Sequence, residues 1–288
     1  MGKASRTRGR RHTDERPAPA PYVRRPFEGL PAETEWVALR ELLPAATAHL
    51  AVTDAAGCSH VTLATVLPLA WPALHRGDGE ILVATQGSSG EDPSRDLAAA
   101  ILAAVALEPG TAVTDRPVIL ASTPRLQDLI DPAANFDVTL HDGFDFWVGE
   151  ADLDDHAAAS LEQANAAVVP TVRVDGAPSV YWTRYGERTY VRWVLAHEED
   201  RATDGLARLI AADRAKLTPD ARLLGAFRAG GLLVPVWEVD PAIEPRALSE
   251  PVAELAPTLS EAIDADRPLD SDQRRARNGL LSRQLTLR

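Results

Sequence analysis

The amino-acid sequence predicts an α+β fold, organised as two tandem α+β domains that each have a mainly antiparallel sheet packed by helices. Apolar and polar residues alternate along two hairpin-like stretches, 136–148 and 179–195. A capping residue followed by proline marks helix starts between strands, as at Asp92-Pro93. Both halves also follow the order helix, three strands, long helix, short helix, strand, although no residue-level repeat supports a duplication.

The domain boundaries follow from shifts in composition along the chain. With 288 residues, of which 45% are apolar, the chain can bury one large core or two of middling size. We expect a disordered basic tail at 1–26, α+β domains at 27–150 and 151–248, and a C-terminal helical segment with a basic tail at 249–288. The N-terminal tail is expected to be disordered because it has too few apolar side chains to offset the entropy of ordering.

Local signals place the individual elements. Helices are expected from Pro31, from Pro93, from Thr123-Pro124, at 156–166, at 201–216, from Thr218-Pro219 and from a capping box that joins Thr258 to Glu261. Strands are expected at 47–53, 60–67, 80–85, 169–174, 179–185, 188–195 and 232–239. Pro235 predicts that the last strand lies at a sheet edge or contains a bulge, because proline cannot donate to a ladder.

The hairpin at 136–148 has two possible registers. A two-residue turn would place Leu140 opposite Asp145, an apolar side chain against a charged one. A three-residue loop, 141–143, instead places Leu140 opposite Phe144 and keeps one apolar face. The sequence therefore favours the longer loop, with Gly143 at a positive φ.

The hairpin at 179–195 is predicted to turn at Gly186-Glu187, which suits a two-residue type II′ turn. One face then carries the apolar residues Val180, Trp182, Val191 and Trp193. The other face carries Thr183 and five candidate interface residues: Tyr181, Tyr185, Arg188, Tyr190 and Arg192. This face suits base stacking or a protein partner, unless a helix covers it and the tyrosine hydroxyls reach water.

Charge divides the chain into an acidic body and two basic ends. The formal net charge is −12, but residues 1–26 carry +6 and residues 273–288 carry +5, which leaves −23 on the rest. The N-terminal tail resembles arms that bind phosphate backbones, and it also suits a solubilising tail or one that folds back on the acidic body. The candidate nucleic-acid contacts are Lys3, Arg6, Arg8, Arg10 and Arg11.

No catalytic residue, metal site, cofactor or small-molecule ligand is identified in the sequence. The single cysteine, Cys58, excludes an intrachain disulfide and a cysteine-only zinc site, and its spacing from His60 is weak support for a dyad. The stretch 86–93 lacks the Gly-Lys-Ser/Thr of a phosphate-binding loop. The acidic stretch 150–155 lacks the glycine and terminal glutamate of a calcium loop.

Four stretches together resemble an uncharacterised actinobacterial family of this length with a basic N-terminal tail. They are Met1-Gly-Lys with the Arg-rich residues that follow, Arg25 to Pro31, Glu35 to Glu41, and Gly230 to Trp237. The resemblance implies no known activity and transfers no functional residue. Relatives sometimes have automatic labels such as topoisomerase or SecA-type translocase subunit, but this sequence has neither a Walker A loop nor a cysteine/histidine zinc tail.

The functional expectation is a non-catalytic cytoplasmic binding or adaptor protein whose basic tails contact RNA, the ribosome or an acidic protein. The longest clean apolar run, 97–107, is shorter than the roughly 20 residues that a bilayer span needs, so no membrane partner is expected. No secretory signal is evident at the N-terminus. The alternative is an enzyme acting on a small molecule, with a site assembled from residues scattered along the chain.

Overall fold

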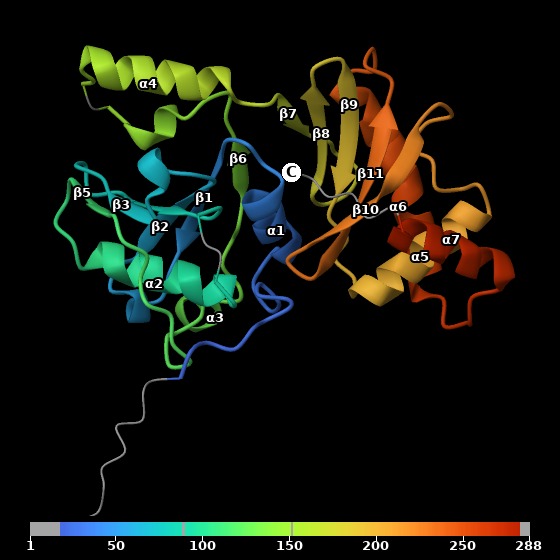
Figure 1. The fold of residues 1–288 in the computed structure, drawn as a ribbon, viewed down its shortest axis with the longest axis horizontal. Helices are drawn as coiled ribbons and strands as arrows, with labels where there is room; N and C mark the ends of the chain where they lie inside the picture. Colours follow the sequence, from blue (N-terminus) through green and yellow to red (C-terminus); the bar gives the residue numbers. More distant parts are fainter. Residues whose placement is uncertain (1–17, 88–89, 151, 283–288) are drawn as a thin grey trace, which may run out of the picture.

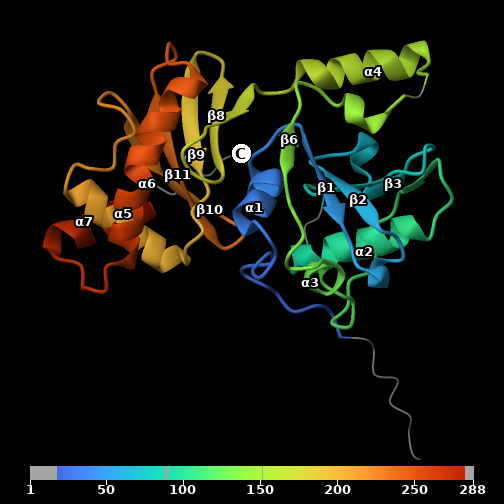
Figure 2. The ribbon, with the colours of Figure 1, turned by 180° about the vertical axis from the view of Figure 1, so that it is seen from behind.

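A computed structural model describes residues 18–87, 90–150 and 152–282 and confirms the α+β class. It contains a mixed six-stranded sheet and an antiparallel five-stranded sheet, each packed by helices. Figures 1 and 2 show the two sheets side by side, with helix α1 (Glu33–Glu41) between them. Because α1 contacts both, it determines how the two halves meet.

The first sheet has the strand order β5-β3-β4-β2-β1-β6. Its strands are β1 (Ala46–Ala51), β2 (His60–Ala64), β3 (Ala73–His75), β4 (Ile81–Ala84), β5 (Thr111–Val113) and β6 (Val138–Leu140). Only β2 and β4 are parallel among the described strands of this sheet, so it is mainly antiparallel, as predicted. Helices α2 (Pro93–Val105) and α3 (Leu126–Leu129) pack on one side, and α4 (Asp155–Ala166) lies on the other (Figure 1).

The second sheet is antiparallel with the order β10-β11-β9-β8-β7. Its strands are β7 (Thr171–Arg173), β8 (Val180–Tyr185), β9 (Arg188–Trp193), β10 (Arg222–Ala229) and β11 (Leu232–Val239). Helices α5 (Glu199–Ala211), α6 (Ser249–Asp264) and α7 (Ser271–Ser282) cover the face of this sheet that points away from the first half (Figure 1). Short 3-10 helices occur at Asp54–Ala56, Pro68–Ala70, Asp145–Trp147 and Pro245–Leu248.

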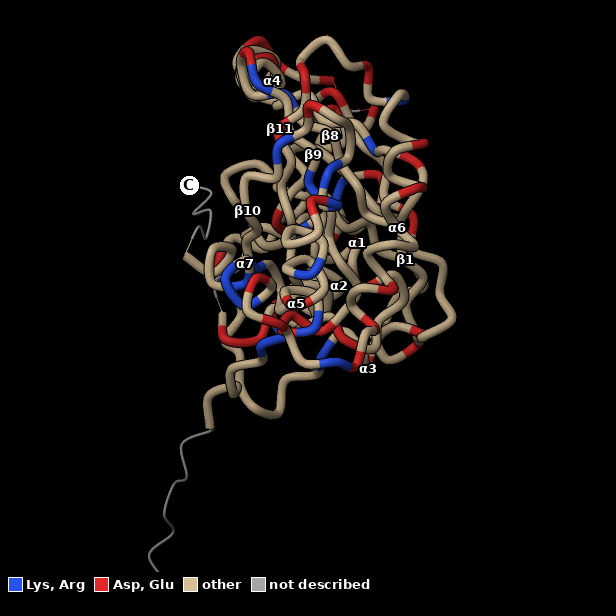
Figure 3. The backbone as a smooth tube through the Cα atoms, turned by 90° about the vertical axis from the view of Figure 1, so that its right-hand side faces the viewer, with Lys and Arg blue, Asp and Glu red and all other residues tan. Residues whose placement is uncertain are grey.

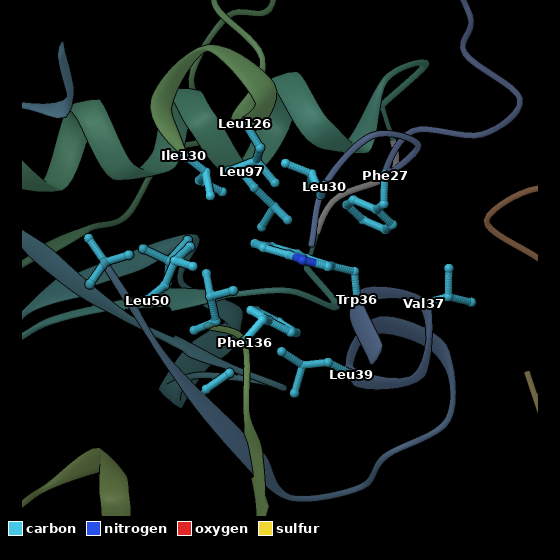
Figure 4. Close-up of a cluster of buried hydrophobic side chains, with 14 of the residues drawn as sticks. Phe27, Leu30, Trp36, Val37, Leu39, Leu50, Leu97, Leu126, Ile130 and Phe136 are labelled. Atoms are coloured by element: carbon cyan, nitrogen blue, oxygen red, sulfur yellow. The ribbon is translucent and has the colours of Figure 1, made fainter. Parts of the chain in front are cut away.

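The core of the first half is built around Trp36 of α1. Its ring stacks between Phe27, at a centroid distance of 5.6 Å, and Phe136, at 4.3 Å (Figure 4). Aliphatic side chains from β1, α2 and α3 complete this cluster. The same cluster includes Tyr181 and Val194 from the second half, so the two halves share buried apolar contacts rather than a solvated linker.

The predicted hairpin at 136–148 is wrong. Its first strand, β6, pairs with β1, so that Leu140 lies opposite Ala46 rather than Phe144. The chain then forms the 3-10 helix Asp145–Trp147, and Gly143 is not among the positive-φ glycines. The aromatic residues turn onto the sheet instead, where the Trp147 indole donates to the carbonyl of Val66 at 2.8 Å.

Several predicted boundaries near the C-terminus are also wrong. Helix α6 begins at Ser249, nine residues before the predicted capping box. The helix contains prolines at 251 and 257, but it forms because one of its faces is apolar and buried. The helix predicted from Thr218-Pro219 is a turn. Strand β11, which contains Pro235, is an inner strand, and its ladder to β9 starts at Val236, after the proline. The bulge lies in the neighbouring strand β10, between Leu223 and Gly225.

Both predicted tails are partly structured. Residues 18–26 run along the first half, where the Val23 amide donates to the Glu91 carbonyl at 2.9 Å and Pro19 bridges to Leu120. This segment passes so close to the β10–β11 turn that a Cβ at Gly231 would lie 2.5 Å from the Arg24 carbonyl oxygen. Residues 273–282 belong to α7. The rest of the predicted tails, 1–17 and 283–288, lies outside the described residues.

Candidate binding surface on the second sheet

The hairpin formed by β8 and β9 has the predicted register. Val180 lies opposite Trp193 and Trp182 lies opposite Val191. Gly186 has φ +57° in the two-residue turn, as the first position of a type II′ turn requires. The alternating pattern of the sequence therefore places the two sets of side chains on opposite faces, as predicted.

One face of the hairpin is the core of the second half. Trp182 and Trp193 are buried there with Trp237 of β11, in a cluster with the apolar sides of α5, α6 and α7. The Trp237 indole donates to the carbonyl oxygen of Ala215 at 2.8 Å, which satisfies its buried N–H. Packing against three helices explains why this face is closed to any partner.

The other face is covered at one end by α1. Tyr181 is fully buried, and its hydroxyl donates to the Glu35 carboxylate. The same carboxylate accepts two hydrogen bonds from Arg173, at 3.0 and 3.1 Å, and one from the Ser179 hydroxyl at 2.7 Å. This buried network joins β7 and β8 to α1, so it holds the halves together.

The electrostatics of this junction keep Tyr181 neutral. Burial, together with the adjacent Glu35 carboxylate, raises the pKa of Tyr181 above its usual value. The hydroxyl therefore stays protonated and remains a donor. The Arg173 guanidinium lies 5.4 Å from the centre of the Tyr181 ring and supplies the opposite charge to Glu35.

Among the helices that the structure describes, none covers the end of this face near the turn (Figure 1). Tyr185 is 50% exposed, and its ring centre lies 6.2 Å from that of Tyr190 across the strand pair. Arg188 and Arg222 are each 70% exposed at the same end and share the carboxylate of Glu238. We call the four residues Tyr185, Arg188, Tyr190 and Arg222 the Tyr/Arg face. Figure 3 shows basic residues along the strands of this sheet.

The five candidate interface residues therefore have different environments. Tyr185 and Arg188 are exposed, Tyr190 is half-buried, and Tyr181 and Arg192 are buried, so a partner cannot reach the last two in this conformation. Arg222 and Glu238 were not predicted to lie on this face, because β10 was not predicted and Pro235 indicated either a sheet edge or a bulge for β11. The proposed nucleic-acid contacts Lys3, Arg6, Arg8, Arg10 and Arg11 lie outside the described residues.

A polar groove of about 520 Å³ lies between the halves and is the structural candidate for the enzyme alternative. Its buried carboxylate, Glu199, is bound by Arg24 at 2.5 Å and by Arg228. These charges are paired with one another, and the described residues that line the groove include no histidine, cysteine or serine. Three further carboxylates, those of Glu41, Glu91 and Asp200, also line the groove.

Other sequence features have structural roles in the described part of the chain. Asp92 caps α2 by accepting from the Ser94 amide, and Asp96 accepts from the Gly90 amide, so these carboxylates occupy the region where a phosphate would bind. Burial raises the pKa of the Cys58 thiol, which is the opposite of what a nucleophile needs. Asp154 caps α4.

No group of three or more His, Cys, Asp or Glu side chains in the described ranges could hold a metal ion. Among the helices described, none is long and apolar enough to cross a membrane.

Comparison with known proteins gives the family and no further relatives. No curated protein and no solved structure matches the chain. Residues 26–288 match a family of unknown function, DUF5926. The match covers helix α1, both sheets and the Tyr/Arg face, and the chain therefore belongs to the DUF5926 family.

Proposed function

We propose that this protein is a non-catalytic cytoplasmic binding protein that takes up single-stranded RNA on the Tyr/Arg face. The observation that supports this most strongly is a sheet face that no described helix covers, on which two neighbouring tyrosines lie beside two exposed arginines that share the carboxylate of Glu238. Sheet faces of this chemistry bind unpaired bases by stacking on the aromatic rings, while arginines contact the phosphates.

The basic N-terminal segment would add affinity without adding sequence preference. The cationic residues before Pro17 can each neutralise a phosphate, and neutralising about five phosphates on a single strand gives a log–log salt slope near −3.5. The acidic body, in contrast, repels RNA elsewhere on the surface. This combination directs the strand to the Tyr/Arg face.

Fluorescence anisotropy with a labelled 12-nucleotide oligouridine tests the proposal. The double variant Tyr185→Ala/Arg188→Ala should weaken binding at least about tenfold, because it removes one stacking platform and one phosphate contact. The matched control Tyr22→Ala/Arg201→Ala removes the same residue types outside the face and should bind like the wild type. Deleting residues 1–17 should flatten the salt dependence while the face still binds.

Two outcomes would contradict the proposal. The first is equal weakening in both double variants, which would mean that the Tyr/Arg face has no special role. The second is no binding of oligouridine but binding of a polyglutamate peptide that the Tyr185→Ala/Arg188→Ala variant loses. That result would make the partner an acidic protein.

A further inference from the structure

Arg192 is a buried arginine that has no acidic partner among the described residues. It lies on β9, the middle strand of the second sheet, and is only 4% exposed. One terminal nitrogen donates to the Thr183 hydroxyl at 2.6 Å, and the Tyr185 side chain lies close enough to interact electrostatically with the guanidinium. Its Nε is buried without an acceptor among the described residues. Burial lowers the pKa of Arg192, although the group stays charged at neutral pH.

Two other shielded arginines of the described structure have different hydrogen-bond partners. Arg173 has the carboxylate of Glu35. Arg208, which is 7% exposed, also has a buried Nε without an acceptor among the described residues, but its terminal nitrogens donate to two backbone carbonyls, that of Ala262 in the last turn of α6 and that of Arg267 just after the helix. A buried cation that is bonded only to hydroxyl groups is expensive to maintain, and such a group is a candidate for binding an anion.

The position of Arg192 connects it to the Tyr/Arg face. Two residues interact with its guanidinium, Thr183 by a hydrogen bond and Tyr185 electrostatically, and both lie on the same face and closer to the turn than Arg192 itself. The guanidinium therefore extends toward the uncovered end of the sheet. Tyr185 is half-exposed and lies at the end of its strand, so its ring can move without disturbing the core.

We propose that Arg192 binds a phosphate of the RNA, and that the Tyr185 hydroxyl occupies the phosphate's place until the ligand arrives. When RNA binds, the Tyr185 ring moves away from the Arg192 guanidinium and stacks on a base. A phosphate oxygen then accepts hydrogen bonds from the guanidinium. The guanidinium fork matches a phosphate in two parallel bonds, which a hydroxyl cannot offer. This inference relies on the proposed function for the identity of the ligand.

The test pairs two arginines of similar burial. Arg192→Met removes a charge that has no carboxylate partner, so the melting temperature should stay the same or rise, while oligouridine affinity falls about tenfold or more. Arg208→Met removes a charge that caps a helix, so the melting temperature should fall while oligouridine affinity is unchanged. If Arg192 is only structural, Arg192→Met will instead melt lower and bind RNA normally.

Tyr185→Phe tests the exchange of partners. It keeps the stacking ring but removes the hydroxyl that competes for Arg192, so oligouridine should bind several-fold more tightly than to the wild type. Weaker binding, as in a Tyr185→Ala variant, would overturn the exchange.

Inorganic phosphate and a 5′-phosphorylated oligouridine distinguish the sources of the phosphate. Tighter binding of the 5′-phosphorylated strand than of the unphosphorylated one, lost in Arg192→Met, would assign the site to a terminal phosphate, whereas equal binding assigns it to the backbone.

If Tyr185→Ala/Arg188→Ala loses RNA but Arg192→Met does not, the proposed function stands and the Arg192 inference fails. If no variant or wild type binds RNA, but phosphate raises the melting temperature only when Arg192 is present, the proposed function fails and the anion site remains.

Discussion

Replacing Trp36 by alanine should lower the free energy of unfolding by about 3–5 kcal/mol, since it leaves a cavity in a well-packed core. Trp36 is 1% exposed and stacks on both Phe27 and Phe136. Its indole N–H also donates to the Pro31 carbonyl at 3.0 Å, which anchors the turn before α1. Urea unfolding followed by circular dichroism measures this loss.

The size of this effect is judged against two controls. Trp36→Phe keeps an aromatic ring and should cost clearly less than alanine. Val118→Ala, at a position that is 80% exposed, should change the free energy of unfolding by no more than about 0.5 kcal/mol. A loss below about 1 kcal/mol for Trp36→Ala would contradict the placement of this ring at the centre of the core.

Replacing Glu35 by alanine should have a comparable effect at the junction of the halves. Removing one partner of a buried ion pair costs about 3–5 kcal/mol, and we expect the lower end because Arg173 is 38% exposed and can turn to water. The hydroxyls of Ser179 and Tyr181 also lose their acceptor. Thermal and urea unfolding of the full chain would report the loss.

A double-mutant cycle separates the network from the single residue. Tyr181→Phe removes one donor to Glu35, so its effect should shrink when Glu35 is already alanine, with a coupling energy of about 0.5–3 kcal/mol. Additive effects of the two substitutions would contradict the hydrogen-bonded junction described above.

The elements that can be predicted from the sequence are those formed by residues close together in the chain. The β8–β9 hairpin follows from a two-residue turn and the alternation of its neighbours, so its register was predicted residue by residue. The stretch 136–148 has a similar pattern, but its strand pairs with β1, which lies about ninety residues earlier in the chain. Competition from a distant strand leaves no signal in a single short segment.

The candidate site shows the same limit. Tyr185, Arg188 and Tyr190 were identified because one hairpin places them on one face. The burial of Tyr181 depends on Glu35, which is 146 residues away, and no pattern within the hairpin reveals that contact. Arg222 joins the face from β10, a strand that its short, irregular apolar pattern did not predict, and the bulge in that strand explains the irregularity.

Photo-cross-linking tests the central claim, that RNA binds on the Tyr/Arg face, most directly. The wild-type chain is irradiated with an oligouridine that contains 4-thiouridine, and the adducts are located by mass spectrometry of the digested protein. We predict that adducts concentrate on the hairpin peptide that contains Tyr185 and Tyr190, and that excess unlabelled oligouridine suppresses them. Adducts confined to α5, α6, α7 or the first sheet, with none between residues 180 and 192, would contradict the account.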